Sequence, residues 1–380
     1  MVGITPLTTA QKISYPIVDT GTTAFYDDRG EITAPKSGES FYGQDGQYTI
    51  NPPKYRDNGD GTVTDLVTGL MWQKDMGDKL AYDEASTKAK KLTLGGYNDW
   101  RVPTIKELYS LILFTGESGG TKAGTFYIDT SYFNQPIGDT SKGEREIDAQ
   151  TWSSTEYVGK TMNNMDTVFG VNFIDGRIKG YPKYDPRTHT AKKMYFRMVR
   201  GNTDYGKNNF VDNGDGTITD FATGLMWQKA DDGKSRDWEK ALAYADTLTL
   251  AGYGDWRMPN AKELQSIVDY TRSPQSSNSA ALDPVFSIST INDPRGKKNY
   301  PYFWTSTTHL EHVLSTSSAV YVAFGEALGQ MHGTIMDVHG AGAQRSDPKS
   351  GNTSEYPQYK GPQGDLRTVF NYVRCVRSIY

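Results

Sequence analysis

The sequence of 380 residues has a single cysteine and no long apolar segment. One cysteine, Cys375, excludes an intrachain disulfide and any metal site built from several thiolates. The strongest apolar run, Leu108–Phe114, is far shorter than the roughly 20 residues that cross a bilayer, so we expect no membrane span. The N-terminus lacks the basic start and apolar stretch of a secretory signal, which leaves two alternatives: a cytosolic protein, or an exported one whose leader is outside this numbering.

The sequence also lacks a surplus of charge of one sign, and it lacks two common catalytic motifs. Lys and Arg number 41 against 45 Asp and Glu, a net charge of -4, which argues against a surface built for nucleic acid. There is no GxxxxGK[ST] phosphate loop and no HExxH zinc motif. We therefore expect a non-catalytic protein. The enzymatic alternative is a pair of carboxylates acting on a polysaccharide, because the separation of carboxylates cannot be deduced from sequence.

The sequence is rich in glycine and tyrosine, and it contains a long internal repeat. Its 39 Gly and 25 Tyr, with 36% hydrophobic residues and a mean hydropathy of -0.64, indicate loop-rich β structure. Asp57–Lys74 (DNGDGTVTDLVTGLMWQK) recurs as Asp212–Lys229 (DNGDGTITDFATGLMWQK), with 15 of 18 positions identical. Leu92–Leu108 recurs as Leu248–Leu264, with 12 of 17 identical. The period of 155 residues exceeds that of solenoid repeats and predicts a tandem duplication of a whole domain.

The repeat divides the chain into three parts. We expect an irregular N-terminal strap over residues 1–42, packed on the first domain. The first copy is placed at 43–202 and the second copy at 206–380, with a polar, glycine-flanked linker between them. Each copy is predicted to be an α+β domain with two helices and a loop-rich antiparallel sheet.

Local patterns predict the helices. Helix formers over Tyr82–Leu92, and apolar residues spaced three and four apart over Trp238–Leu248, predict the first helix of each copy. The Tyr-, Trp- and Gly-rich segments that follow the helices alternate as strands do. The second helix of each copy is predicted by a capping box, and the two boxes are Thr104 with Glu107 and Asn260 with Glu263.

Four motifs together resemble the Lcl C-terminal domain family of bacterial collagen-like adhesins. They are DNGDGTxTDxxTGLMWQK, GYxDWRxPxxKEL, a WSST-like segment at Thr151–Thr155 and the closing Val373–Arg377 (VRCVR), and the resemblance covers roughly 50–200 and 206–380. It implies a C-type-lectin-like fold, related to formylglycine-generating enzymes, in exported bacterial proteins. The family pattern also implies a cysteine in the first helix, where this sequence has Ala245, so Cys375 lacks the expected partner.

The resemblance implies an adhesin-like protein that binds glycans or another cell-surface ligand without chemistry. We accordingly expect it to be extracellular, at the cell surface or in the periplasm. Besides the polysaccharide-acting enzyme, a second alternative is a structural or protein-partner module of an envelope assembly. A homo-oligomer stays open, and no cofactor is expected apart from calcium.

Two acidic loops are the calcium candidates. The repeated DNGDG segments place Asp57 and Asp60 in the first copy, and Asp212 and Asp215 in the second, at spacings that suit oxygen ligation. The loops lack the closing glutamate of an EF-hand, so tight hairpin turns are the alternative.

Ligand candidates lie where the two copies differ. A glycine-rich stretch before the last strand gathers Asp337, His339, Arg345 and Asp347, which could hold a metal or hydrogen-bond sugar hydroxyls; an ordered structural loop is the alternative. The stretch with Lys183, Arg187, Lys192 and Lys193 could dock a sulfated or carboxylated polysaccharide, or be a solvated strand pair.

Aromatic side chains are the remaining candidates. Trp304 and Tyr302 could stack on sugar faces if they are exposed, and core packing is the alternative. Asp99, Trp100 and Arg101, repeated in the second copy, are expected to be a fold signature in which the arginine pairs with a carboxylate and the tryptophan fills the core.

Overall fold

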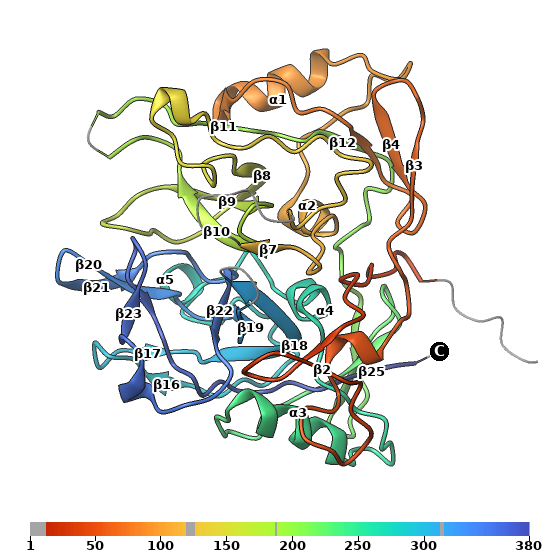
Figure 1. The fold of residues 1–380 in the computed structure, drawn as a ribbon, viewed down its shortest axis with the longest axis vertical. Helices are drawn as coiled ribbons and strands as arrows, with labels where there is room; N and C mark the ends of the chain where they lie inside the picture. The colour runs from red at the N-terminus through yellow and green to blue at the C-terminus, as the bar shows by residue number, and fades with distance from the viewer. Residues whose placement is uncertain (1–12, 119–125, 187, 312–314, 380) are drawn as a thin grey trace, which may run out of the picture.

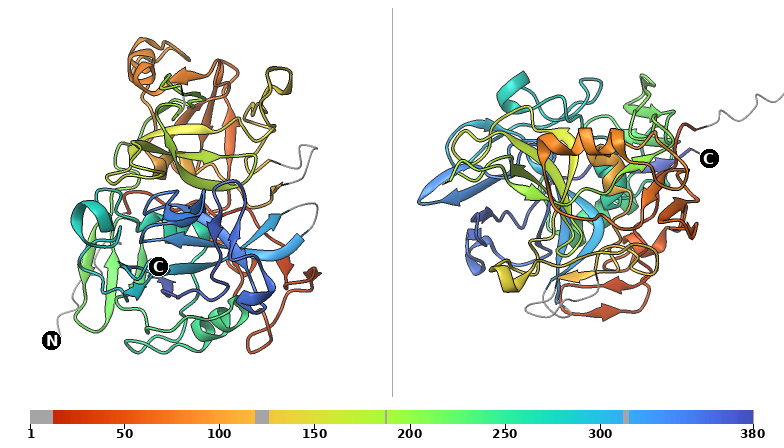
Figure 2. Two further views of the ribbon diagram at one scale, coloured as in Figure 1. Left: turned by 90° about the vertical axis from the view of Figure 1, so that its left-hand side faces the viewer. Right: turned by 90° about the horizontal axis from the view of Figure 1, so that it is seen from above.

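The computed structural model describes residues 13–118, 126–186, 188–311 and 315–379, which form an α+β fold with short helices and mostly antiparallel sheets. The first copy lies in the upper half of Figure 1 and the second copy in the lower half, and the left view of Figure 2 shows the same division. In the part of the chain described, no helix is both long and apolar enough to cross a membrane.

Each copy opens with the repeated motif folded as a small antiparallel sheet. Asx turns close the motif hairpins: the Asp57 carboxylate accepts from Gly59 N at 2.9 Å, and Gly59 has a positive φ of 76°. A late strand of each copy returns to pair with the motif. The sheets run β12 (Val199–Arg200), β5 (Met71–Gln73), β4 (Thr62–Asp65), β3 (Tyr55–Asp57), and β13 (Phe210–Asp212), β14 (Thr217–Asp220), β15 (Leu225–Gln228), β25 (Val376–Ser378).

The helices confirm the local predictions. The first helix of each copy is α1 (Tyr82–Lys91) or α3 (Trp238–Thr247). The second is α2 (Ile105–Tyr109), capped by Thr104, or α4 (Ala261–Ser266), capped by Asn260. Both capping boxes form as expected, because the glutamate three residues after each cap accepts from the cap backbone N–H. A short α5 (Pro274–Ser277) belongs to the second copy.

One seven-stranded sheet runs through both copies. Its order is β7 (Glu117–Ser118), β18 (Tyr302–Glu311), β19 (Ser315–Ala323), β22 (Gln344–Pro348), β10 (Arg177–Pro182), β9 (Thr167–Asn172) and β8 (Thr151–Glu156). Strand β8 corresponds to β18, because Ser154 N donates to Pro103 O as Ser306 N donates to Pro259 O. The mirrored strand order then matches β9 with β19 and β10 with β22. Equivalent strands β10 and β22 meet antiparallel at the centre, so an approximate two-fold axis relates the copies.

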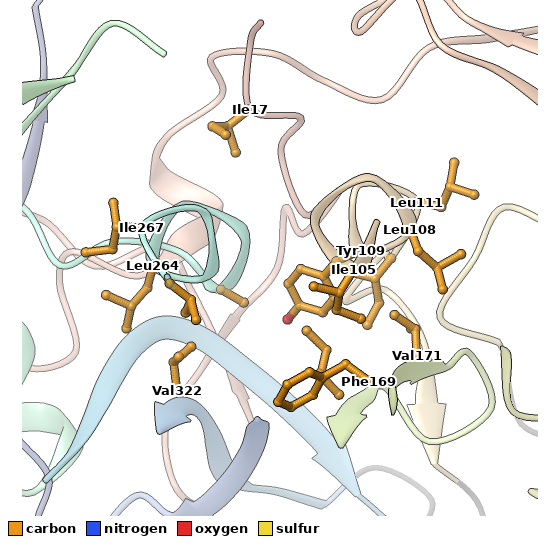
Figure 3. Packing of buried hydrophobic residues seen from close by; sticks show 14 of the residues in the cluster. Ile17, Ile105, Leu108, Tyr109, Leu111, Phe169, Val171, Leu264, Ile267 and Val322 are labelled. Atoms are coloured by element: carbon orange, nitrogen blue, oxygen red, sulfur yellow. The ribbon is translucent and has the colours of Figure 1, made fainter. Parts of the chain in front are cut away.

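The two short helices α2 and α4 contact each other over one face of this sheet. Figure 3 shows Tyr109 of α2 between Leu264 of α4 and Leu108 of α2, above Val171 and Val322 of the sheet. These residues belong to one buried cluster that spans both copies. Burial of this shared apolar surface, at about 25 cal/mol per Å², holds the two copies together.

A reciprocal pair of lysines crosses the two-fold axis. Lys106 Nζ of α2 donates to Ser266 O at 2.6 Å, and Lys262 Nζ of α4 donates to Ser110 O at 2.8 Å. Each ammonium therefore lies against the carbonyl end of the partner helix, where a positive charge is favourable. The shared KEL motif thus builds the contact between the copies.

The N-terminal strap differs from the prediction. We expected it on the first copy, and it does accept a hydrogen bond there, from Phe114 N to Thr20 O at 2.9 Å. Most of its length, however, lies on the second copy, where Lys349 Nζ donates to Asp27 O at 3.0 Å. Its red ribbon runs beside α3 in Figure 1.

The remaining elements are short. The second copy carries an extra sheet in the order β21 (Thr334–Asp337), β20 (Leu328–Met331), β24 (Asp365–Leu366), β23 (Tyr359–Lys360), which has no counterpart among the described residues of the first copy. Two-stranded pairs are β1 (Phe25–Tyr26) with β2 (Glu31–Ile32), β6 (Leu80–Ala81) with β11 (Lys193–Met194), and β16 (Ile291–Asn292) with β17 (Lys298–Asn299); 3-10 turns are at Asp45–Gln47, Thr140–Lys142 and Thr353–Glu355.

Candidate ligand pocket between the two copies

A charged cavity of about 370 Å³ lies where β10 and β22 meet. We call it the junction pocket. Its charged wall combines both copies and the extra sheet: Arg177 and Lys179 from β10, Arg345 and Asp347 from β22, Glu311 from β18 and Asp365 from β24. Side chains alternate along a strand, so Ile178, which lies between Arg177 and Lys179, packs into the shared core instead.

Arg345 binds a carboxylate supplied by the extra sheet. Its Nε donates to Asp365 Oδ2 at 2.9 Å, its Nη2 contacts the same oxygen, and His339 Nε2 lies 2.7 Å from Asp365 Oδ1. Although burial alone would raise it, Arg345 and His339 hold the pKa of Asp365 well below its usual value. Burial lowers the pKa of His339 to about 4, so the imidazole is neutral at pH 7.

A second ion-pair network closes the other end of the pocket. Glu311 Oε1 accepts from Arg177 Nη2 at 2.6 Å and from Ser346 Oγ at 2.5 Å, and Lys360 Nζ lies 3.0 Å from Glu311 Oε2. Burial opposes ionisation of Glu311, but Arg177, His309, Lys360 and Ser346 together outweigh it and lower the carboxyl pKa. Burial and Arg177 together lower the pKa of the adjacent His309 to about 4.

Two cations that line the pocket, Lys179 and Arg367, have no ion pair with a described carboxylate, and Lys179 is the buried one of the two. It is only 8% exposed, and its Nζ lies 5.3 Å from the centre of the Tyr181 ring. Within the described residues no carboxylate comes within ion-pair distance of it. Burial, followed by repulsion from Arg345, lowers the pKa of Lys179 to about 8, so the ammonium form still predominates at pH 7.

Three further polar atoms of the pocket lining have no hydrogen-bond partner among the described residues: Arg345 Nη1, Asp347 Oδ1 and Asp175 Oδ1. The other oxygen of Asp347 accepts from Thr368 Oγ1 at 2.6 Å and from Asn371 Nδ2 at 3.1 Å. Burial raises the pKa of Asp347 to about 6. Buried polar atoms normally find hydrogen-bond partners, so unpartnered ones in a cavity wall are available to a ligand.

The glycine-rich stretch is thus partly gathered at one site. Arg345 and Asp347 line the junction pocket, and His339 reaches it through Asp365. Asp337 lies apart, since its carboxylate accepts from Tyr157 Oη and Gly340 N, both at 2.8 Å, and burial raises its pKa to about 7. Because Tyr157 belongs to the first copy, Asp337 joins the two copies.

The other predicted ligand residues are dispersed. Trp304 is fully buried and Tyr302 is 5% exposed, stacked on Tyr321 with ring centres 4.4 Å apart, so the exposure needed for sugar stacking is absent. Lys183 Nζ pairs with Glu156 at 2.9 Å, Lys192 lies over the Tyr181 ring at 5.4 Å, and Lys193 is exposed in β11. Arg187 lies outside the described residues.

The acidic loops are organised as turns. Asp57 Oδ2 pairs with Lys74 Nζ at 2.5 Å, and Asp212 with Lys229 at the same distance. Asp60 and Asp215 each accept from the hydroxyl of a following threonine at 2.6 Å. In the part of the chain that the structure covers, no group of three or more His, Cys, Asp or Glu side chains is placed to hold a metal ion.

The DWR motifs form the predicted fold signature. Trp100 and Trp256 are each 3% exposed. Arg101 pairs with Glu107 through two bonds of 2.6 and 2.5 Å, and Arg257 pairs with Glu263 through two bonds of 2.6 Å. These residues hold the second helix of each copy against the closing strand.

Sequence reasoning missed four residues of the pocket wall: Arg177, Lys179, Glu311 and Asp365. It also missed a GxSxG match at Gly116–Gly120, although Gly119 and Gly120 lie outside the described residues. Ser118 of this match lines the junction pocket and donates to Leu310 O at 3.4 Å, while His309 Nε2 lies 2.9 Å from Asp175 O. Among the described residues no hydrogen bond joins Ser118 to His309, so they do not form a nucleophile and base pair.

Comparison with known proteins gives one result. The sequence profile of the Lcl C-terminal domain matches residues 61–200 and again 216–339. No curated protein and no solved structure matches the chain. The two matches span more than half of the sequence and coincide with the two repeats, so this chain belongs to the Lcl C-terminal domain family and contains two tandem copies of that domain.

Proposed function

We propose that this chain is a non-catalytic binding protein that recognises an acidic glycan in the junction pocket. The observation that carries the proposal is Lys179, a buried cation without a carboxylate partner among the described residues, beside the unpartnered Nη1 of Arg345. A carboxylate or sulfate entering the pocket would accept charge-assisted hydrogen bonds from both.

Asp365 supports a carboxylated ligand. Its side chain shows that Arg345 and the neutral His339 together accommodate a planar carboxylate. Polar groups that suit sugar hydroxyls also line the cavity, namely Ser118, Ser318, Ser346 and Gln363. A glycan with uronic or sialic acid units offers both kinds of group.

The carboxylates of the wall favour binding over hydrolysis. Glycoside hydrolysis needs one carboxyl that acts as an acid and a second that is free to act as base or nucleophile. Burial raises the pKa of Asp347 to about 6, which suits the acid role, but Glu311 and Asp365 are held in ion pairs by Arg177 and Arg345. Neither is therefore free to act as the base or nucleophile. The binding role agrees with an exported, surface-attached protein whose copies have a C-type-lectin-like fold, and both of these features are part of the proposal.

A glycan array tests the proposal. Oligosaccharides with uronic, sialic or sulfated units should bind, whereas their neutral analogues should not. Arrays run with calcium and with a chelator should agree, because the proposed contacts are direct. If the protein binds none of the acidic glycans on the array, the proposal is contradicted. Steady release of reducing ends from a bound glycan would also contradict it.

Titration calorimetry with the tightest-binding glycan from the array then tests whether Lys179 contributes to binding. Lys179→Gln should weaken binding roughly tenfold, the effect of losing a charged hydrogen bond worth about 1.5 kcal/mol. Lys88→Gln on the exposed face of α1 is the matched control and should bind normally. Wild-type affinity should fall as pH rises through about 8, where Lys179 loses its proton. Equal affinity of Lys179→Gln and wild type would place the ligand elsewhere.

A further inference from the structure

Residues 37–48 form a cover over the second copy, which we call the cover segment. The Phe41 ring lies 6.2 Å from the Trp238 ring of α3, and Ser37 Oγ donates to Asp246 at 3.3 Å. Asp45 accepts from Thr307 Oγ1 of β18 at 2.6 Å. The segment therefore crosses a groove between the first helix and the first long strand of this copy.

The end of the cover segment and an earlier part of the strap complete the cover. The guanidinium of Arg257 lies 5.0 Å from the centre of the Tyr48 ring. Lys349 Nζ donates to Tyr26 O and Asp27 O, while it also lies 4.2 Å from the Trp238 ring centre. As a result Trp238, Leu242 and Thr307 are almost completely buried.

The first copy has the same groove, and none of the described residues covers it as the cover segment covers the second copy. Matching hydrogen bonds identify the equivalent residues: Ile105 N donates to Thr155 Oγ1 as Ala261 N donates to Thr307 Oγ1, both at 3.0 Å. The contact between Lys349 and the Trp238 ring is repeated in the first copy, where Lys183 lies 4.7 Å from the centre of the Tyr82 ring. By the same repeat, Ser86 replaces Leu242 and Arg101 replaces Arg257.

This groove encloses about 480 Å³ along α1, between Tyr82, Ala85, Ala89, Trp100, Val102 and Arg101. The equivalent arginines differ in exposure because the cover segment covers only the second copy: the Arg101 side chain is 29% exposed, whereas the Arg257 side chain is 6% exposed. Ser86 is exposed where Leu242 is buried. The linker between the copies, residues 203–205, is too short to supply a second cover segment.

The charges and hydrogen-bonding groups of the first-copy groove indicate which kind of ligand it could bind. The cover segment carries Glu39 and Asp45 and no Lys or Arg. Among the described residues that line the first-copy groove, Lys90 and Arg101 are cationic and Asp83 is anionic. Arg101 already pairs with Glu107, and Lys183, above the Tyr82 ring, pairs with Glu156.

Thr155 lies in the adjoining cavity, which shares Arg101, Val102 and Ser154 with the groove. It accepts a hydrogen bond, but its hydroxyl proton has no acceptor among the described residues, whereas the equivalent Thr307 donates to Asp45.

We infer that the first-copy groove binds an extended, acidic peptide segment of a partner protein, with an aromatic residue against Tyr82 and a carboxylate about four residues later at Thr155. Phe41 and Asp45 show this spacing in the cover segment. The inference does not depend on the proposed glycan function.

A synthetic peptide with the sequence of residues 35–50 is the probe, and its binding to the full chain is measured by fluorescence anisotropy. Wild type should bind the peptide saturably. Ser86→Arg, which places a bulky side chain in the groove from an exposed position, should weaken binding roughly tenfold or more. The matched control Thr87→Arg lies next to it, outside the groove, and should bind as wild type does.

The peptide itself is the second variable. A peptide with Asp45→Ala should bind several-fold more weakly, because Thr155 loses its acceptor. No binding of the wild-type peptide, or binding that Ser86→Arg leaves unchanged, would overturn the inference. Self-association of the chain that Ser86→Arg abolishes would also overturn it, since the occupant would then be a second copy of the chain.

Discussion

The two copies share a frame and differ in what surrounds it. In the first copy β9 turns directly into β10, and the groove along α1 is open. In the second copy the hairpin β20–β21 separates β19 from β22, and the cover segment closes the groove along α3. Identical motif residues make identical bonds in both copies, so the repeated sequence specifies the frame. The asymmetric wall of the junction pocket and the open groove arise where one copy has an unrepeated segment that the other lacks.

The largest effect should come from the frame. Arg197 and Arg374 are fully buried, and each donates to three backbone carbonyls: Gln73, Lys74 and Asn134, or Gln228, Lys229 and Ser287. Replacing either with Ala should lower the free energy of unfolding by about 3 to 5 kcal/mol, because three buried acceptors lose their partner. Urea denaturation measures this.

The exposed Arg29→Ala serves as control and should change stability little. Equal losses of unfolding free energy in Arg197→Ala and Arg374→Ala would sharpen the comparison, since the shared frame would then contribute equally to the stability of both copies. A large loss in only one of them would break it.

The next effect should come from the lysines that cross the two-fold axis. Burial lowers the pKa of Lys262 to about 7 and that of Lys106 to about 8. In the unfolded chain both lysines keep their protons up to about pH 10, so between about pH 7.5 and 9.5 the unfolded state binds more protons and stability should rise with pH.

Lys262→Met should remove roughly 2 kcal/mol or more of that rise, and Lys106→Met somewhat less. Unfolding free energies at a series of pH values give the two slopes, with Lys88→Met as the surface control. Slopes that neither variant alters would show that the buried ammonium groups do not set the pH dependence.

The smallest effect concerns the inserted hairpin of the second copy. Burial raises the pKa of Asp337 to about 7, above its ordinary value of 3.8, so the folded state holds a proton that the unfolded state has lost. This carboxyl therefore favours folding at acidic pH, and its contribution is lost as pH rises through about 7.

Asp337→Asn keeps an acceptor oxygen for Gly340 N, replaces the oxygen beside Tyr157 with an amide that can donate to the Tyr157 hydroxyl, and removes the titration. The difference in unfolding free energy between the variant and the wild type should shift in favour of the variant by roughly 1 kcal/mol or more when the pH rises from about 5 to about 8. Thermal unfolding at both pH values measures the change, and Asp60→Asn in an exposed turn is the control. A constant difference across pH would contradict the raised pKa.

Local signals made much of the frame predictable. The spacing of apolar residues and the capping boxes identified all four main helices, and the DNGDG segments identified the hairpin turns, because each signal acts within a few residues. The DWR motifs could be assigned to the fold because both copies retain them and both must fold.

The pocket could not be predicted in the same way. Arg177 meets Glu311 across 134 positions of sequence, and this contact depends on β10 pairing with β22. No local pattern specifies which strand edges of two domains will join. The same difficulty explains the strap, whose neighbours on the second copy are some 200 to 320 residues away. Only the position of the inserted stretch, found where the repeats diverge, indicated the pocket.

The antiparallel meeting of β10 and β22 has a consequence for how this molecule can vary. Two identical subunits joined at that seam would depend on concentration to associate, and any insertion would occur on both sides of the axis. Covalent linkage replaces that dependence with a high effective concentration, so the halves remain paired at any dilution. It also releases each half from matching the other. A cavity with one asymmetric wall, such as that supplied by Asp365, is accessible to a fused chain but not to a symmetric pair.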